Sequence, residues 1–166
     1  ERAVQWVRAR IQPVQSWYLD VSLLARYYDS GPVGSDRVYH HTAPISAIYG
    51  LAEAPRLVDE EGMPARTRRH AEAGRALVTG LEALGFEPLV AEASRLPMLS
   101  ALRLPAAVSG RGEAALRRRL LEHHGIEVGG GLGALAGQIW RVGLMGENAR
   151  PECVSRLLGA LREELA

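Results

Sequence analysis

The clearest β-strand pattern in the 166-residue chain is Gln138-Ile-Trp-Arg-Val-Gly-Leu-Met145. Apolar side chains surround Arg141 within it. A buried arginine needs an anionic partner, and its planar guanidinium matches a carboxylate through two parallel hydrogen bonds. A solvent-facing arginine on an edge strand explains the same pattern equally well. Arg141 is therefore a candidate anion-binding residue with an open structural alternative.

Around this strand, hydrophobic spacing predicts an alternation of helices and strands. The helices are expected to carry one apolar stripe each, and the strands are short apolar runs bounded by Pro or Gly. The order helix, strand, strand, helix, strand, strand, helix predicts an α+β fold, with a short sheet and helices on one face. The expected elements are helices at 65–84, 112–124 and from about 149 onward, and strands at 86–90, 97–104, 126–128 and 138–145.

The first 62 residues show helices and loops without a sheet to pack against. We therefore interpret 1–62 as the tail of another domain and 63–166 as a small separate domain. Helical spacing starts at Asp20, and the composition of 29–36 is typical of a loop. Pro55 is expected to kink or end the helix in which it lies.

The segment Tyr39-His-His-Thr42 leads directly into a second apolar helix, with Pro44 in the expected first turn. A hydroxyl and free N–H groups at a helix start can bind an anion, and Tyr39 adds another donor. An ordinary N-cap at Thr42 with a packed tyrosine is an equally good interpretation. Tyr39 and Thr42 are thus candidate anion-binding residues.

The remaining motifs favour structural roles. The loop Gly129-Gly-Gly-Leu-Gly133 lacks the residues that make a phosphate loop, so a turn is favoured over ligand contact. Adjacent histidines, 40–41 and 123–124, are expected to point apart, without acidic ligands at metal spacing, so no metal site is expected. Cys153 is interpreted as a small hydrophobe, and the arginine runs at 66–69 and 117–119 as solvated helix faces.

Composition excludes several mechanisms. All 20 basic residues are arginine, so the chain itself contains no lysine for a Schiff base, a P-loop or general base catalysis. The net charge of +1 gives no global attraction for nucleic acid or an anionic membrane. No apolar run is long enough to span a membrane, and no signal peptide is visible. A single cysteine suits a reducing compartment, so a cytoplasmic location is expected.

Three motifs in order resemble one enzyme family. Tyr39-His-His-Thr-Ala-Pro-Ile-Ser46, Glu127-Val-Gly-Gly-Gly-Leu-Gly133 and Trp140-Arg-Val-Gly-Leu-Met-Gly146 closely resemble segments of the alanine–glyoxylate and serine–pyruvate aminotransferases. Two shorter segments, Ser16-Trp-Tyr-Leu-Asp20 and Arg95-Leu-Pro97, match in the right order as well. These are class V, fold-type I enzymes that depend on pyridoxal 5'-phosphate (PLP). The resemblance covers the whole chain and the C-terminal part of the family's length.

The resemblance implies roles for the candidate residues. Tyr39 and Thr42 correspond to residues that reach across a homodimer interface to the cofactor phosphate of the neighbouring subunit. Arg141 corresponds to the arginine that binds the substrate carboxylate. The chain from 63 onward would be the small C-terminal domain of a fold-type I PLP enzyme, with a mostly antiparallel sheet. The catalytic Schiff-base lysine is expected upstream of Glu1, so the chain alone is expected to be inactive.

The implied reaction is transfer of an amino group from alanine or serine to a 2-oxo acid such as glyoxylate or pyruvate. The C-terminal motifs equally fit another class V reaction, such as ureidoglycine–glyoxylate transamination. The missing lysine leaves a third interpretation, in which the chain is a non-catalytic dimerising module.

Overall fold

The computed structural model describes residues 2–12, 14–28 and 39–166, so the loop expected at 29–36 lies outside the described residues. The chain forms two compact units, Glu1–Ala54 and Pro55–Ala166. The boundary expected between residues 62 and 63 stays a prediction. In the described part of the chain, no helix combines the length and apolar character needed to cross a bilayer.

The first unit is helical in its described part. It contains α1 (Arg2–Arg8), the 3-10 helix η1 (Trp17–Leu19), α2 (Val21–Tyr28) and the start of α3 (Ile45–Glu61). The carboxylate of Asp20 accepts a hydrogen bond of 2.9 Å from the backbone N–H of Ser22, which caps the first turn of α2. The helix expected from Asp20 is therefore confirmed.

Helix α3 corrects two expectations. It starts at Ile45, so Thr42 lies before the helix and is not its N-cap. Pro55 lies inside the helix and does not end it. The ring removes one backbone donor, and the carbonyl of Leu51 loses that partner. Leu51 is exposed, so water can satisfy its carbonyl and the helix can continue. The helix ends at Glu61, and Gly62 follows it with a positive φ of 78°.

The α-helices and strands of the second unit follow the expected order, with one additional α-helix and three 3-10 helices. Helix α5 (Ala106–Arg111) follows Pro105. Its sequence is short and interrupted by a glycine, and it has no apolar stripe that would predict a helix. The other elements are α4 (Met63–Glu82), β1 (Glu87–Pro88), η2 (Glu92–Ser94), β2 (Leu99–Arg103), α6 (Glu113–His124), β3 (Gly129–Gly130), η3 (Gly133–Leu135), β4 (Ile139–Gly143), η4 (Gly146–Asn148) and α7 (Pro151–Leu165).

The described strands form one antiparallel sheet in the order β1-β2-β4-β3. In the register of β4, Arg141 lies opposite Ala101 of β2 and opposite Gly129 of β3. The strand expected at 126–128 is displaced: pairing occurs at Gly129–Gly130, within the expected glycine loop. Val128 is instead buried in the core, which explains its apolar character.

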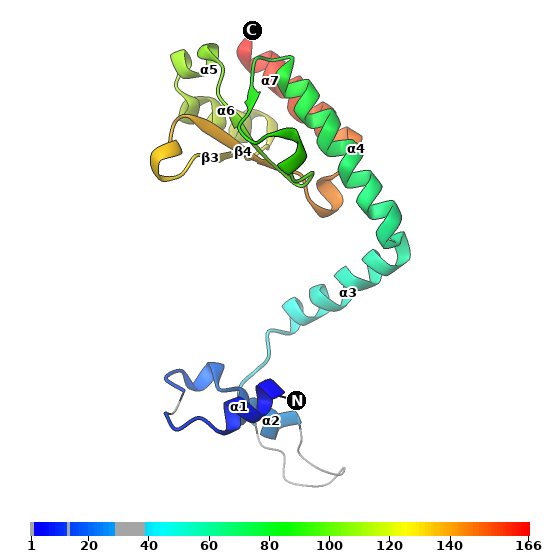
Figure 1. Ribbon diagram of the computed structural model, residues 1–166, viewed down its shortest axis with the longest axis vertical. Coiled ribbons are helices and arrows are strands. Elements are labelled where there is room, and N and C mark those ends of the chain that lie inside the picture. The colour runs from blue at the N-terminus through cyan, green and yellow to red at the C-terminus, as the bar shows by residue number, and fades with distance from the viewer. Residues whose placement is uncertain (1, 13, 29–38) are drawn as a thin grey trace. The chain divides into compact units, whose positions relative to one another are not determined.

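The core lies between the sheet and the helices. Trp140 is 1% exposed and packs against Phe86, with ring centroids 5.4 Å apart. Helices α4 and α7 lie side by side in this layer (Figure 1). Their apolar stripes join those of the sheet and of α6 in a single cluster that contains Leu77, Leu81, Leu102, Leu116, Leu120, Val142 and Leu161. The α+β fold expected from the sequence is confirmed.

Candidate functional site

Arg141 lies on β4, which is bonded to β2 on one side and to β3 on the other. It is therefore not on an edge strand, and that alternative is wrong. Side chains alternate along a strand, so the buried Trp140 and Val142 face the core and Arg141 points to the opposite face. Its side chain is half-buried, and Nε donates a 2.9 Å hydrogen bond to the carbonyl of Gly130. Among the described residues it forms no ion pair.

Two neighbouring glycines lie where a side chain would meet other atoms: Gly129 beside the Arg141 guanidinium, and Gly131 inside the loop that follows. A β-carbon on Gly129 would lie 3.4 Å from Nη2 of Arg141, so any longer side chain there would cover that nitrogen. A β-carbon on Gly131 would lie 1.9 Å from the carbonyl oxygen of Leu135, which no side chain can tolerate. Gly129 and Gly131 thus have structural reasons to be glycine, and Gly129–Gly130 form strand β3 instead of the turn expected for this part of the motif.

A carboxylate from α6 anchors β4 from the core side. Glu113 accepts a 3.1 Å hydrogen bond from the indole N–H of Trp140 and pairs with Arg117 at 2.7 Å. The bond from Arg117 lowers the pKa of Glu113, which keeps it ionised and able to accept both bonds. Sequence reasoning missed Glu113, because its partner on β4 is 27 positions away.

The turn after β4 is held by α4. Arg69 donates hydrogen bonds to the carbonyls of Gly146 (2.8 Å) and Ala149 (2.9 Å), and it pairs with Glu61 at 2.6 Å. The bond from Arg69, together with Arg66, lowers the pKa of Glu61 to about 2. These two arginines are therefore not merely a solvated helix face, which corrects the sequence interpretation.

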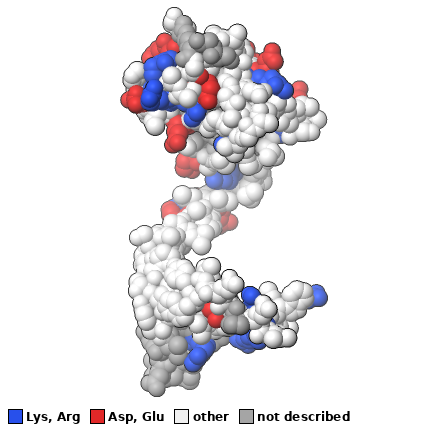
Figure 2. Space-filling model, turned by 90° about the vertical axis from the view of Figure 1, so that its left-hand side faces the viewer, with Lys and Arg blue, Asp and Glu red and all other residues white. Residues whose placement is uncertain are grey.

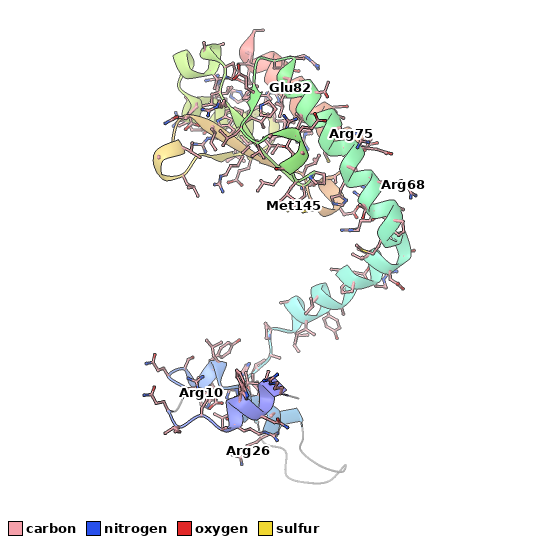
Figure 3. All side chains as sticks on the ribbon, viewed as in Figure 1. Arg10, Arg26, Arg68, Arg75, Glu82 and Met145 are labelled. Carbon is pink, nitrogen blue, oxygen red and sulfur yellow. The ribbon has the colours of Figure 1, made fainter. Side chains whose placement is uncertain are left out.

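Other arginines of the second unit do face solvent. Arg68 and Arg75 are exposed and extend outward from α4 (Figure 3). On the face shown in Figure 2, basic and acidic side chains are mixed over this unit.

His70, next to Arg69, completes the anchor of this turn. Its Nδ1 lies 2.8 Å from the carbonyl oxygen of Arg66, and its Nε2 accepts a 3.1 Å hydrogen bond from the backbone N–H of Gly146. Both bonds form together only when the proton is on Nδ1. The turn after β4 is thus tied to α4 by three hydrogen bonds, of which Arg69 donates two and His70 accepts one.

In the first unit, Tyr39 and Thr42 are brought together. Their hydroxyl oxygens lie 2.6 Å apart, and both side chains are exposed, Tyr39 at 66%. At this distance one hydroxyl donates a hydrogen bond to the other, and the hydroxyl that accepts it can donate its own proton to an anion. The sequence predicted both residues as anion ligands, and the structure places them side by side.

Aromatic rings hold the segment that carries this pair. Trp17 stacks on the ring of His40, with ring centroids 4.1 Å apart. The rings of Tyr18 and His41 have centroids 4.4 Å apart. His40 is buried, and its Nε2 has no hydrogen-bond partner among the described residues. The two histidines contact one another instead of pointing apart. The segment 16–20 thereby supports the segment 39–42.

The second histidine pair also contradicts the expected divergence. His123 and His124 both contact Glu164 on α7, at 2.9 and 3.3 Å. Sequence spacing missed this carboxylate because it comes from an element about forty residues further along the chain.

Cys153 is half-buried near the start of α7.

The known proteins that are similar to this chain include several aminotransferases. No protein-family model matches the chain. It is 36% identical over 168 residues to the alanine–glyoxylate aminotransferase of Drosophila melanogaster and 38% identical over 166 residues to that of Oryctolagus cuniculus. Each match covers 99% of this chain and 41% of the relative. The chain therefore spans about two fifths of the length of these relatives.

Solved structures agree with the sequences. The alanine–glyoxylate aminotransferase from Nostoc sp. superposes with a TM-score of 0.83 at 46% identity, covering 100% of this chain and 42% of that one. The ureidoglycine–glyoxylate aminotransferase from Bacillus subtilis gives 0.83 at 34% identity, covering 99% and 40%. Fold and sequence thus make the chain a homologue of the class V, PLP-dependent aminotransferases. Within that class its relatives include the alanine–glyoxylate aminotransferases, whose C-terminal part it matches over its full length.

Proposed function

We propose that the protein containing this chain is a PLP-dependent aminotransferase that moves an amino group from alanine or serine to a 2-oxo acid such as glyoxylate or pyruvate. The main support is the match to alanine–glyoxylate aminotransferases over 99–100% of this chain, at 36–46% identity. In this proposal the chain contributes substrate binding and cofactor binding, and a lysine outside these 166 residues carries out proton transfer.

Arg141 is proposed to bind the carboxylate that amino donors and 2-oxo acceptors share. Its Nε is occupied by the carbonyl of Gly130, which leaves both terminal nitrogens for the two oxygens of one carboxylate. Because Gly129 has no side chain, one edge of the guanidinium stays accessible. The hydrogen bond to Gly130 fixes the direction in which the fork points.

Tyr39 and Thr42 are proposed to hold the PLP phosphate. A phosphate group offers several acceptor oxygens, so this hydrogen-bonded pair of hydroxyls can donate to this end of the cofactor. When bound, PLP supplies the electron sink for the substrate carbon that loses its proton. Tyr39 and Thr42 anchor the group by its phosphate, and no lysine of this chain can do so.

A homodimer follows from the same assignment. Tyr39 and Thr42 are exposed residues, and in this proposal their hydroxyls bind a cofactor held by a second subunit. We expect the full-length protein to elute as a dimer in size-exclusion chromatography with light scattering.

A cytoplasmic location, proposed from the single cysteine, is tested by cell fractionation.

Transamination between ureidoglycine and glyoxylate is the second candidate. A Bacillus subtilis (S)-ureidoglycine–glyoxylate transaminase is 34% identical over 154 residues, and it covers 93% of this chain. Both candidates use Arg141 in the same way, because both amino donors carry a carboxylate.

Steady-state kinetics of the full-length protein with PLP tests the proposal. Glyoxylate serves as the acceptor, and alanine, serine and (S)-ureidoglycine are compared as donors. We expect the highest kcat/KM with alanine or serine. Higher kcat/KM with ureidoglycine selects the second candidate. A PLP-loaded protein that transfers no amino group from any of the three donors overturns the proposal in favour of a non-catalytic dimerising protein.

A further inference from the structure

The end of α6 carries a cluster that the aminotransferase proposal leaves unused. His123 Nδ1, His124 Nε2 and a carboxylate oxygen of Glu164 all lie within 4.8 Å of one another. His123 uses the ring nitrogen nearer its backbone and His124 the farther one. Adjacent residues on a helix can converge on one point in this way, because the longer reach compensates for the different direction.

Two of the three separations between the ligand atoms are close to those in the first coordination shell of zinc. His123 Nδ1 lies 2.9 Å and His124 Nε2 3.3 Å from the same oxygen, Oε1 of Glu164. Bonds of about 2.0–2.1 Å to a tetrahedral ion place neighbouring ligand atoms about 3.3 Å apart. Two imidazoles and one carboxylate favour zinc over calcium or magnesium, which prefer oxygen ligands alone.

The ligands are also held from outside the cluster. Arg119 donates a 2.6 Å hydrogen bond to Oε2 of Glu164, which leaves Oε1 turned toward the rings. Arg156 on α7 donates to the backbone carbonyl of His124, and Gly125 ends α6 in a left-handed conformation (φ 62°) just after it. Such outer contacts orient ligands in metal sites and raise affinity.

We propose that His123, His124 and Glu164 bind one zinc ion that links the end of α6 to α7, with the fourth position open to water. The site lies entirely within the second unit, and its ligands come from two elements about forty residues apart. A bound ion therefore closes a long loop of chain and stabilises the packing of α6 against α7.

The test is zinc titration of the full-length protein without an affinity tag, after removal of metals by a chelator. Isothermal calorimetry at neutral pH is expected to give one equivalent per chain with a Kd of about 1 μM or tighter. Cobalt titration is expected to give the visible spectrum of a tetrahedral ion. His123→Gln and Glu164→Gln are each expected to weaken zinc binding at least about tenfold. Glu163→Gln, which changes the exposed neighbour on α7, is the matched control and is expected to bind like the wild type.

Thermal unfolding supplies a second readout. Saturating zinc is expected to raise the unfolding midpoint of the wild type and of Glu163→Gln by several degrees, and to leave His123→Gln unchanged. His123 is 56% exposed, so its replacement leaves the core intact even where Glu164→Gln fails to fold. No saturable zinc binding by the wild type overturns the proposal. Equal zinc affinity in the wild type and His123→Gln overturns it as well, whatever Glu164→Gln does.

Discussion

Replacing Arg141 by lysine keeps the positive charge on β4 and removes the planar fork. In the wild type, Nε is held by the carbonyl of Gly130 at 2.9 Å, and both terminal nitrogens are proposed to donate to the substrate carboxylate. A lysine ammonium is a single point of charge, and it cannot bond Gly130 and both carboxylate oxygens in the same geometry. The variant therefore loses at least one charge-assisted hydrogen bond to the substrate.

The expected magnitude follows from that bond. A hydrogen bond to a charged group contributes about 1.5–3 kcal/mol, which corresponds to about a 10- to 150-fold loss in kcat/KM. The carboxylate is bound before and during the reaction, so most of the loss should be in KM. Both half-reactions should be affected alike, because alanine and glyoxylate each carry a carboxylate.

The assay measures kcat/KM of the full-length protein for alanine and for glyoxylate, in the wild type, Arg141→Lys and Arg103→Lys. Arg103 is the matched control, since it is an exposed arginine on the neighbouring strand β2. Values for Arg141→Lys within twofold of the wild type would refute the assignment. An equal loss in both variants would also refute it, because it would indicate a general effect of charge.

Three further predictions concern the cofactor, pH and the glycine loop. Tyr39→Phe removes one of two adjacent hydroxyls and is expected to raise the Kd for PLP about tenfold or more in an equilibrium titration; an unchanged Kd contradicts the phosphate assignment. Arg69 and, to a smaller extent, Arg66 lower the pKa of Glu61 from 4.5 to about 2, so these ion pairs stabilise the fold above pH 4.5 and the contribution is lost as the pH falls toward 2. Urea unfolding between about pH 3 and pH 6 should show a shallower acid dependence in Glu61→Gln, and parallel curves would exclude this linkage. Gly131→Ala places a β-carbon 1.9 Å from the carbonyl oxygen of Leu135 and should lower the free energy of unfolding by about 1–3 kcal/mol, whereas equal denaturation midpoints would show that the loop can relax.

Local patterns predicted most of the second unit. Leucines at helical spacing, such as Leu77 and Leu81, identified α4 because one apolar stripe is buried in the core. Strand β3 was not predicted at its observed position, because it consists of Gly129 and Gly130, which have no side chains to alternate. The prediction that the helix could end at Pro55 was wrong, because a helix tolerates the loss of one hydrogen bond where water replaces it.

The candidate site was predicted only in part, for a different reason. Arg141 could be found because it interrupts an apolar strand, and Tyr39 with Thr42 because they precede a helix. Their supporting partners, such as Glu113 and His70, depend on contacts over 27 and 76 positions. Such contacts exist only after the chain has folded, and no local spacing encodes them.

The position of β4 inside the sheet has a consequence for how donor preference can change in the proposed function. Hydrogen bonds on both sides and the anchors at Trp140 and Gly146 prevent the backbone under Arg141 from shifting without breaking several contacts at once. In the proposed function, the carboxylate is thus a fixed reference point, and every amino donor is aligned from it. A change of preferred donor would then have to arise where the rest of the substrate lies. Directed evolution toward a new donor should therefore leave residue 141 untouched and accumulate its substitutions elsewhere.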